Sequence, residues 1–187
     1  MIVTLTINPT IDHVISVDRL AFEDRAYINS THESAGGRGI NASCVIHSFG
    51  GKTLALLICG GDAGKRLQEH LLCGGQEFQV VPVENEIRTN LTITDKHGLT
   101  VNLNEAGPTL SKAEVARVVD SSIDVIRETV VGGERVTLAD FGTFERKHRN
   151  ERIARNPRKP DVPIVVPARD LPSFTAGKEF RAQVLGE

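Results

Sequence analysis

The densest group of side chains that could do chemistry lies between residues 146 and 159. Seven basic residues stand there against one acid, Glu151, so the stretch has a net charge of +6. A surplus of this size attracts a polyanion such as nucleic acid, although a solvated surface strand can also carry such a run. The seven basic residues are Arg146, Lys147, Arg149, Arg152, Arg155, Arg158 and Lys159.

A second candidate site is the glycine-rich turn Gly36-Gly37-Arg38-Gly39-Ile40-Asn41. Glycines let backbone amides approach an anion, the start of a helix adds partial positive charge, and Arg38 adds a formal charge. These features suit a phosphate group. A plain tight turn between a strand and a helix needs the same glycines, so the spacing alone leaves both interpretations open.

The stretch Gly60-Gly61-Asp62-Ala63-Gly64-Lys65 is superficially similar to a nucleotide-binding P-loop. Its first and last glycines stand one residue too close together for that motif. Arg66 occupies the position where Ser or Thr must hold magnesium. We therefore expect a simple helix cap here.

Composition predicts a cytoplasmic protein with a substantial core. The chain has 187 residues, of which 40% are apolar, enough for one medium domain or two small ones. No segment approaches the roughly 20 uncharged apolar residues that cross a bilayer, and the first residues lack the basic region of a signal peptide, so we expect no membrane partner. The cysteines Cys44, Cys59 and Cys73 form no CxxC pair. They predict reduced, buried thiols and no metal site.

The two halves of the chain differ in charge. Residues 1–110 carry 8 basic against 12 acidic residues, a net charge of −4, and residues 111–187 carry 14 against 12, a net charge of +2. The first half also alternates strand-like with helical segments, which predicts an α/β architecture. Strands are predicted at residues 1–7, 12–20, 52–59, 78–83, 89–94 and 99–103, and helices at about 40–49 and 63–72.

The second half begins with a helix. Ser111 and Glu114 form a capping box, and an apolar face follows at helical spacing until Gly132-Gly133. A strand is predicted at 135–144 and a short helix at about 176–185. Between them lies a basic stretch with five prolines, which must form a sheet edge or a protruding arm because proline at this density does not fit a sheet centre. These prolines are Pro157, Pro160, Pro163, Pro167 and Pro172.

Residues 1–108 resemble the N-terminal part of the PfkB (ribokinase-like) sugar kinases, in the branch of 1-phosphofructokinase and tagatose-6-phosphate kinase. The matching segments are TINPTID at 6–12, AGGRGINAS at 35–43, RTN at 88–90 and NEAGP at 104–108. The resemblance implies an incomplete ribokinase-like fold. It also implies that Asp12, Gly37 and Asn41 hold sugar hydroxyls, and that Arg38 and Arg88 with Asn90 hold the sugar phosphate. The implied sugar-phosphate site comprises Asp12, Gly36, Gly37, Arg38, Asn41, Arg88 and Asn90.

The chain departs from this kinase family in its catalytic half. Phosphoryl transfer needs a base for the acceptor hydroxyl and a cradle for the nucleotide phosphates. The kinases carry both in a Gly-Ala-Gly-Asp type motif, and this sequence has none. We therefore expect no catalytic residues, no cofactor and no kinase activity, with residual sugar-phosphate binding at most. ATP and magnesium enter only under the alternative that a partner chain supplies the missing half.

Residues 109–187 resemble the HU/IHF family of bacterial nucleoid proteins. The matching segments are LSKAE at 110–114, DFGTF at 140–144, ARNP at 154–157 and PSFTAGKEF at 172–180. The resemblance implies an α+β half with a protruding β-arm, and a homodimer whose paired arms follow the minor groove of double-stranded DNA. Pro157 would enter between base steps, Arg152, Arg155 and Arg158 would meet the backbone and groove, and Lys178 and Arg181 would contact flanking phosphates. Asn156 belongs to the same arm-tip motif.

This second half also departs from its family. The first HU helix is absent, so Val115, Val119 and Ile126 would stay partly uncovered unless the kinase-like half covers them. We interpret the chain as a fusion of a truncated kinase-like segment, 1–108, with a truncated HU-like segment, 109–187. The favoured function is sequence-independent binding and bending of double-stranded DNA by a homodimer at the nucleoid. The alternatives are a sugar-phosphate kinase completed by a partner, and an inactive fragment that associates through exposed apolar surface.

Overall fold

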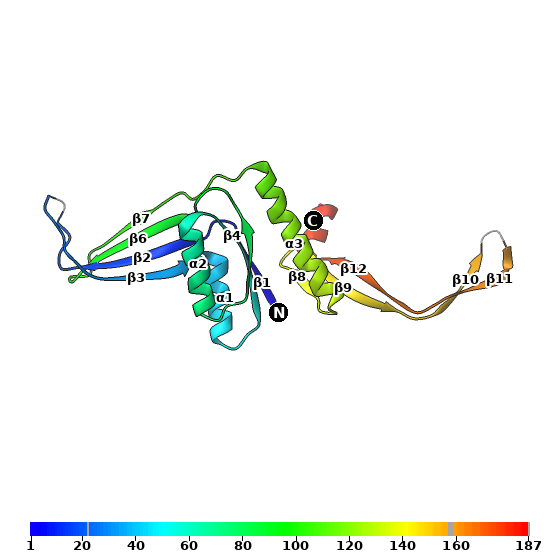
Figure 1. Cartoon of the computed structure of the whole chain (residues 1–187). Helices are drawn as coiled ribbons and strands as arrows, with labels where there is room; N and C mark the ends of the chain where they lie inside the picture. Colours follow the sequence, from blue (N-terminus) through cyan, green and yellow to red (C-terminus); the bar gives the residue numbers. More distant parts are fainter. Residues whose placement is uncertain (22, 157–158, 187) are drawn as a thin grey trace. The chain divides into compact units, whose positions relative to one another are not determined.

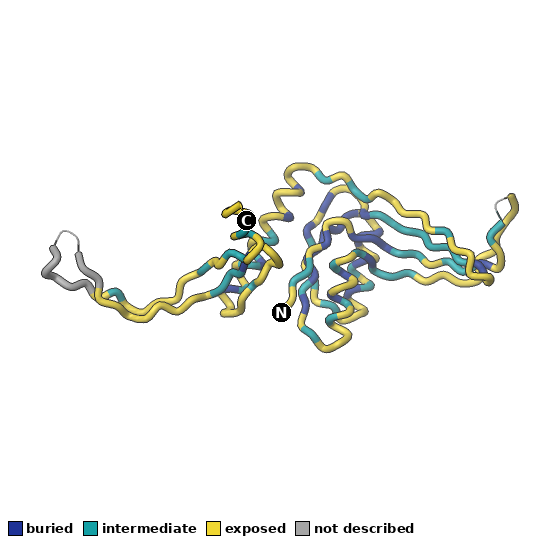
Figure 2. The backbone as a smooth tube through the Cα atoms, turned by 180° about the vertical axis from the view of Figure 1, so that it is seen from behind, coloured by how far each residue is buried: buried dark blue, intermediate teal, exposed yellow. Residues whose placement is uncertain are grey.

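The computed structural model describes residues 1–21, 23–156 and 159–186, and of residues 154–156 and 159–164 the backbone alone. The chain forms two compact units, Met1–Val119 (unit 1) and Asp120–Glu187 (unit 2). The division falls within helix α3 (Lys112–Val131), whereas the sequence places the junction of the two segments at residues 108/109. Buried residues are concentrated in unit 1 (Figure 2).

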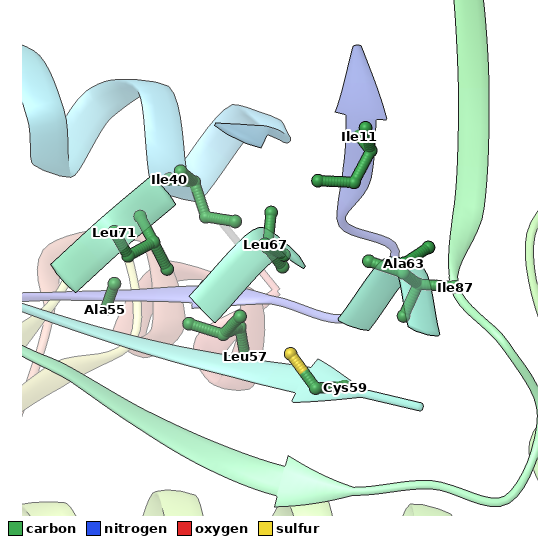
Figure 3. Packing of buried hydrophobic residues seen from close by; sticks show 9 residues of the cluster. All are labelled: Ile11, Ile40, Ala55, Leu57, Cys59, Ala63, Leu67, Leu71 and Ile87. Atoms are coloured by element: carbon green, nitrogen blue, oxygen red, sulfur yellow. The ribbon is translucent and has the colours of Figure 1, made fainter. Parts of the chain in front are cut away.

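A three-stranded parallel sheet lies at the centre of unit 1. Its order is β1 (Ile2–Thr6), β4 (Thr53–Cys59) and β5 (Phe78–Pro82). The nearly continuous apolar run of β4 is buried, as expected for a strand that is covered on both faces. Helices α1 (Arg38–Ser48) and α2 (Gly61–Cys73) pack on one face, where Leu57 of β4, Ile40 of α1 and Leu67 of α2 meet in the main core (Figure 3).

A four-stranded sheet extends from this core (Figure 1). Its order is β3 (Ile28–Gly36), β2 (Thr10–Val17), β6 (Arg88–Asp95) and β7 (Thr100–Asn104). The predicted hairpin between β6 and β7 is confirmed, and the Asp95 carboxylate closes it by accepting hydrogen bonds from the backbone N–H groups of His97 and Leu99. Strand β3 was not predicted, because its largely exposed sequence INSTHESAG shows no apolar alternation.

Helix α3 starts at the predicted capping box. The Ser111 hydroxyl accepts a hydrogen bond from the Glu114 N–H, and the Glu114 carboxylate accepts bonds from the N–H and the hydroxyl of Ser111. The same carboxylate accepts a bond of 2.8 Å from the Glu84 N–H, which ties the helix to the segment after β5. One turn later, Val118 is buried against Leu56 and other residues of β4 and β5. The first half of α3 therefore covers the second face of the parallel sheet, which explains why it belongs to unit 1.

The hydrogen bonds from Glu84 and Ser111 lower the pKa of Glu114 from 4.5 to about 2. A depressed carboxyl pKa stabilises the fold above pH 4.5, and this contribution is lost as the pH falls toward 2. We expect the free energy of unfolding to fall more steeply between pH 4.5 and 2 in the wild type than in Glu114→Gln, as measured by urea titration. The control Glu128→Gln, at an exposed position of the same helix, should follow the wild type. Equal slopes for all three proteins would refute the assignment.

Unit 2 contains a three-stranded antiparallel sheet and a separate two-stranded one. The first has the order β12 (Arg169–Ala176), β9 (Gly142–Arg149), β8 (Val136–Leu138), and the second pairs β10 (Arg152–Asn156) with β11 (Lys159–Val166). Pro160 and Pro163 lie in β11 and Pro172 in β12, strands that have a single neighbour each among the described residues. Their edge positions agree with the expectation from proline. Helix α4 (Lys178–Leu185) is the last described element.

The single strand predicted over 135–144 is wrong. The chain turns between β8 and β9, and Asp140 adopts a left-handed conformation with φ 61°. Aspartate tolerates this conformation because its short polar side chain bonds locally, so no glycine marks the turn in the sequence. The turn brings Phe141 within 5.3 Å of Phe174 and 5.1 Å of Phe180, measured between ring centroids, and this cluster fastens α4.

Three further expectations concern exposure. Cys59 is buried, and burial raises the pKa of its thiol to about 12, but Cys73 is exposed because it lies at the end of α2. The expectation of buried thiols is therefore wrong for Cys73 and is met only in part by Cys44, which is half-buried. Val115 and Val119 are about half exposed, on either side of the buried Val118.

No described helix is both long and apolar enough to cross a bilayer.

Candidate nucleic-acid interface and candidate sugar-phosphate site

Strand β9 divides its basic side chains between two faces, because successive residues of a strand point to opposite sides. Arg146 shares a face with His148 and with Asp170 of β12, directly opposite His148. The Arg146 Nη1 donates to the Val131 carbonyl at the end of α3 (3.4 Å), and its Nε lies 3.7 Å from the Asp170 carboxylate. His148 Nδ1 lies 2.7 Å from the same carboxylate. Arg146 therefore has partners within the fold.

Lys147 and Arg149 lie on the other face of β9. Both are exposed, and the described part of the chain gives neither of them an ion pair. Across the ladder stand Leu171 and Arg169 of β12. The side chains of Lys147 and Arg149 are therefore available to bind an anion. The sequence gives no reason to treat any of the seven basic residues differently. The pairing of β9 with β12 shows that Arg146 has partners within the fold, whereas Lys147 and Arg149 lie on the opposite face.

The other predicted DNA-contacting residues lie beyond this ladder or on α4. Arg152 is exposed at the start of β10, and the backbone of Arg155, Asn156 and Lys159 lies in the β10–β11 pair. Pro157 and Arg158 lie outside the described residues. On α4, Lys178 and Arg181 are exposed in the first two turns. Their roles remain predictions.

An apolar groove of about 530 Å³ runs between the second half of α3 and the sheet of unit 2. Ile123, Ile126 and Val130 line it from the helix, and Phe144 and Phe174 line it from β9 and β12. Phe174 is about two fifths exposed. The sequence predicted that Ile126 stays partly uncovered, but it did not predict the groove, because the groove arises from the packing of a helix against strands that are distant in the sequence.

Four of the predicted sugar-phosphate residues lie at one end of the four-stranded sheet, where β2 and β6 begin and β3 ends: Asp12, Gly36, Arg88 and Asn90. Ser34, Asp12 and Asn90 lie side by side across β3, β2 and β6, and Gly36, Thr10 and Arg88 form another such row. The Asn90 amide donates to the Asp12 carboxylate at 2.9 Å. A Cβ at Gly36 would clash with that carboxylate and with the Thr10 methyl group, so a larger residue here would displace Asp12 or Thr10.

Helix α1 begins directly after this row. Gly37 has φ 126°, a conformation that favours glycine, and Arg38 and Asn41 are exposed in the first turn. Asn90 Oδ1 and Arg88 Nε are buried and have no protein partner among the described residues. Such polar atoms are rare in folded proteins, and a bound ligand can satisfy them.

The P-loop-like stretch is a helix cap, as expected. Gly60 is the N-cap of α2, and the Ala63 N–H donates to the Glu86 carboxylate at 2.8 Å. A carboxylate of the chain itself therefore occupies the anion-attracting end of this helix.

Two families match the chain. The pfkB family carbohydrate kinases match residues 4–123, and the bacterial DNA-binding proteins match residues 94–185. The DNA-binding protein HU of Synechocystis sp. is 43% identical over 83 residues, which cover 44% of this chain and 82% of that protein.

The kinase-like part has relatives of much greater length. The ATP-dependent 6-phosphofructokinase isozyme 2 of Mycobacterium tuberculosis is 31% identical over 120 residues, which cover 64% of this chain and only 35% of that enzyme. The phosphofructokinase-2 of Escherichia coli has the same fold, with a TM-score of 0.63 at 23% identity over 66% of this chain and 41% of that one. The chain thus belongs to two families: its N-terminal part matches a portion of the pfkB family carbohydrate kinases, and its C-terminal part belongs to the family of bacterial DNA-binding proteins that includes HU.

Proposed function

We propose that the chain binds and bends double-stranded DNA without sequence preference, as a homodimer at the nucleoid. The observation that carries this proposal is the exposed face of β9, where Lys147 and Arg149 have no partner among the described residues. Cationic side chains that lie on a strand without an ion-pair partner can bind the regularly spaced phosphates of a duplex. Arg152, Lys178 and Arg181 are exposed in the same unit and add to this charge.

The homodimer is supported by the apolar groove of unit 2. Exposed apolar area of this kind marks a surface that a partner covers. Ile123 on α3 and Phe174 on β12 are both exposed at the groove. A second copy would shelter these side chains and bring two basic hairpins to one duplex.

The proposal is tested by titrating two labelled 30-bp duplexes of unrelated sequence with the full chain. We expect their dissociation constants to agree within about threefold, because phosphate contacts carry no sequence information. Dyes at the two duplex ends should approach one another on binding, as read by energy transfer. Absence of binding, or binding to one sequence alone, would contradict the proposal.

A second candidate function is sugar-phosphate binding without turnover. Asn90 Oδ1 and Arg88 Nε are buried and have no partner among the described residues, which favours a ligand at the two neighbouring rows that contain Asp12 and Thr10. The chain covers about a third of the curated kinase, so we expect no phosphoryl transfer from ATP to fructose 1-phosphate or tagatose 6-phosphate. A rise in the melting temperature with either sugar phosphate would support binding. Nucleotide turnover by the purified chain would favour the kinase alternative.

A further inference from the structure

A hollow of about 580 Å³ lies in unit 2, lined by the segments that connect β9 to β10 and β11 to β12. Figure 1 shows where these segments run in the chain. Three arginines line it, Arg149, Arg152 and Arg169, together with Asn150 and Glu151. With three guanidinium groups and one carboxylate, the lining carries a net charge of +2. Arg169 lies outside the basic run at 146–159 in the sequence. The pairing of β9 with β12 brings it to the hollow.

Arg149 and Arg169 stand directly opposite each other in the β9–β12 ladder. Like charges in this arrangement repel and destabilise the pair of strands. A counter-charge within the fold would remove the repulsion. Asp170, next to Arg169 in sequence, belongs to the other face, where it contacts Arg146 and His148. Glu151 lines the hollow and is the one carboxylate that could offset part of this charge. Among the residues described with side chains, none of the three arginines of the hollow forms an ion pair, and both Arg149 and Arg169 are exposed.

We propose that this hollow is a phosphate-binding pocket, in which Arg149, Arg152 and Arg169 bind one phosphate group. Guanidinium groups match phosphate oxygens with paired hydrogen bonds, and several of them around a concave site outcompete water for the anion. The inference rests on the proposed function in naming a phosphodiester of duplex DNA as the source. Free polyphosphate offers the same chemistry, and the experiment separates the two sources.

The test compares Arg169→Ala with Arg135→Ala, which removes the same charge from an exposed position of unit 2 outside the hollow. In the first arm, inorganic tripolyphosphate is added at constant ionic strength without DNA. We expect the melting temperature of the wild type and of Arg135→Ala to rise and that of Arg169→Ala to stay unchanged. Without phosphate, Arg169→Ala should melt slightly above the wild type because the like-charge pair is gone, and this also shows that the variant folds.

In the second arm, the same proteins are titrated with a 30-bp duplex. We expect Arg169→Ala to weaken binding by roughly fivefold to tenfold. The slope of log affinity against log salt should become shallower by about 0.9 for each DNA phosphate that the variant no longer neutralises. Arg169→Lys keeps the charge but loses the paired donors of the guanidinium group, so it should recover the salt slope and only part of the affinity.

The outcomes separate the two proposals. The pocket is overturned if tripolyphosphate shifts the melting temperatures of the wild type and Arg169→Ala equally, or if Arg169→Ala and Arg135→Ala bind the duplex with equal affinity. In either case, duplex binding by the wild type would leave the proposed function intact. Loss of the tripolyphosphate shift in Arg169→Ala, in a protein that binds no duplex, supports the pocket with free phosphate as its ligand and overturns the proposed function.

Discussion

Replacing Val118 with Asp is expected to unfold unit 1. Val118 is 6% exposed and packs against Leu56, Ile58 and Val81 of the parallel sheet. A carboxylate at this position would be buried without a partner, at a cost of about 4 kcal/mol or more, which is a large part of the stability of an ordinary domain. Urea unfolding followed by circular dichroism should show the loss directly.

The neighbouring residue provides a matched control. Val119 is 51% exposed, so Val119→Asp should change the free energy of unfolding by no more than about 0.5 kcal/mol. If both variants were equally stable, α3 would not cover the sheet as described. The first half of α3 is also the part of the chain that both families match, because their matched segments overlap from residue 94 to 123. A large loss of stability in Val118→Asp alone would show that this half of the helix is part of the core of unit 1.

Replacing Lys147 and Arg149 together with Ala should weaken duplex binding by roughly tenfold to a hundredfold near 100 mM salt. Both side chains lie on the open face of β9, so each is available to a phosphate. Fluorescence anisotropy with a labelled duplex measures the change. The double variant Lys112→Ala, Arg135→Ala has the same net charge and alters exposed positions away from β9.

Arg146→Ala should lower the stability of the protein and leave its duplex affinity nearly unchanged, in contrast to the loss of Lys147 and Arg149. Arg146 contacts Asp170 and the Val131 carbonyl, so its removal should lower the melting temperature and change duplex affinity by less than about threefold. If Arg146→Ala weakened binding as much as the loss of Lys147 and Arg149, the division of β9 into an occupied face and an open face would be incorrect.

Local signals in the sequence predicted most of unit 1. The capping box fixed the start of α3 because Ser111 and Glu114 satisfy each other's backbone groups within a single turn. Glycines marked the starts of α1 and α2, and the apolar run of β4 marked a strand buried on both faces. These features depend on neighbours in sequence, so they can be recognised without the fold.

Features that depend on distant partners were not predictable in the same way. Strand β3 is held by β2 and has little apolar character of its own, and the turn at Asp140 contains no glycine before the strand resumes. The basic run likewise gave no sign that Arg146 contacts Asp170 or that Arg169 stands opposite Arg149. These facts follow from the register between β9 and β12, which the turn and the intervening hairpin determine.

The most direct test of duplex binding by the basic face of unit 2 is the salt dependence of wild-type affinity. About six phosphate contacts in a dimer should give a slope of log affinity against log salt near −5 and a loss of roughly a thousandfold between 50 and 200 mM salt. A steep slope of this kind is the predicted result. Affinity that stays constant over this range, or no measurable affinity at 50 mM, would contradict the account.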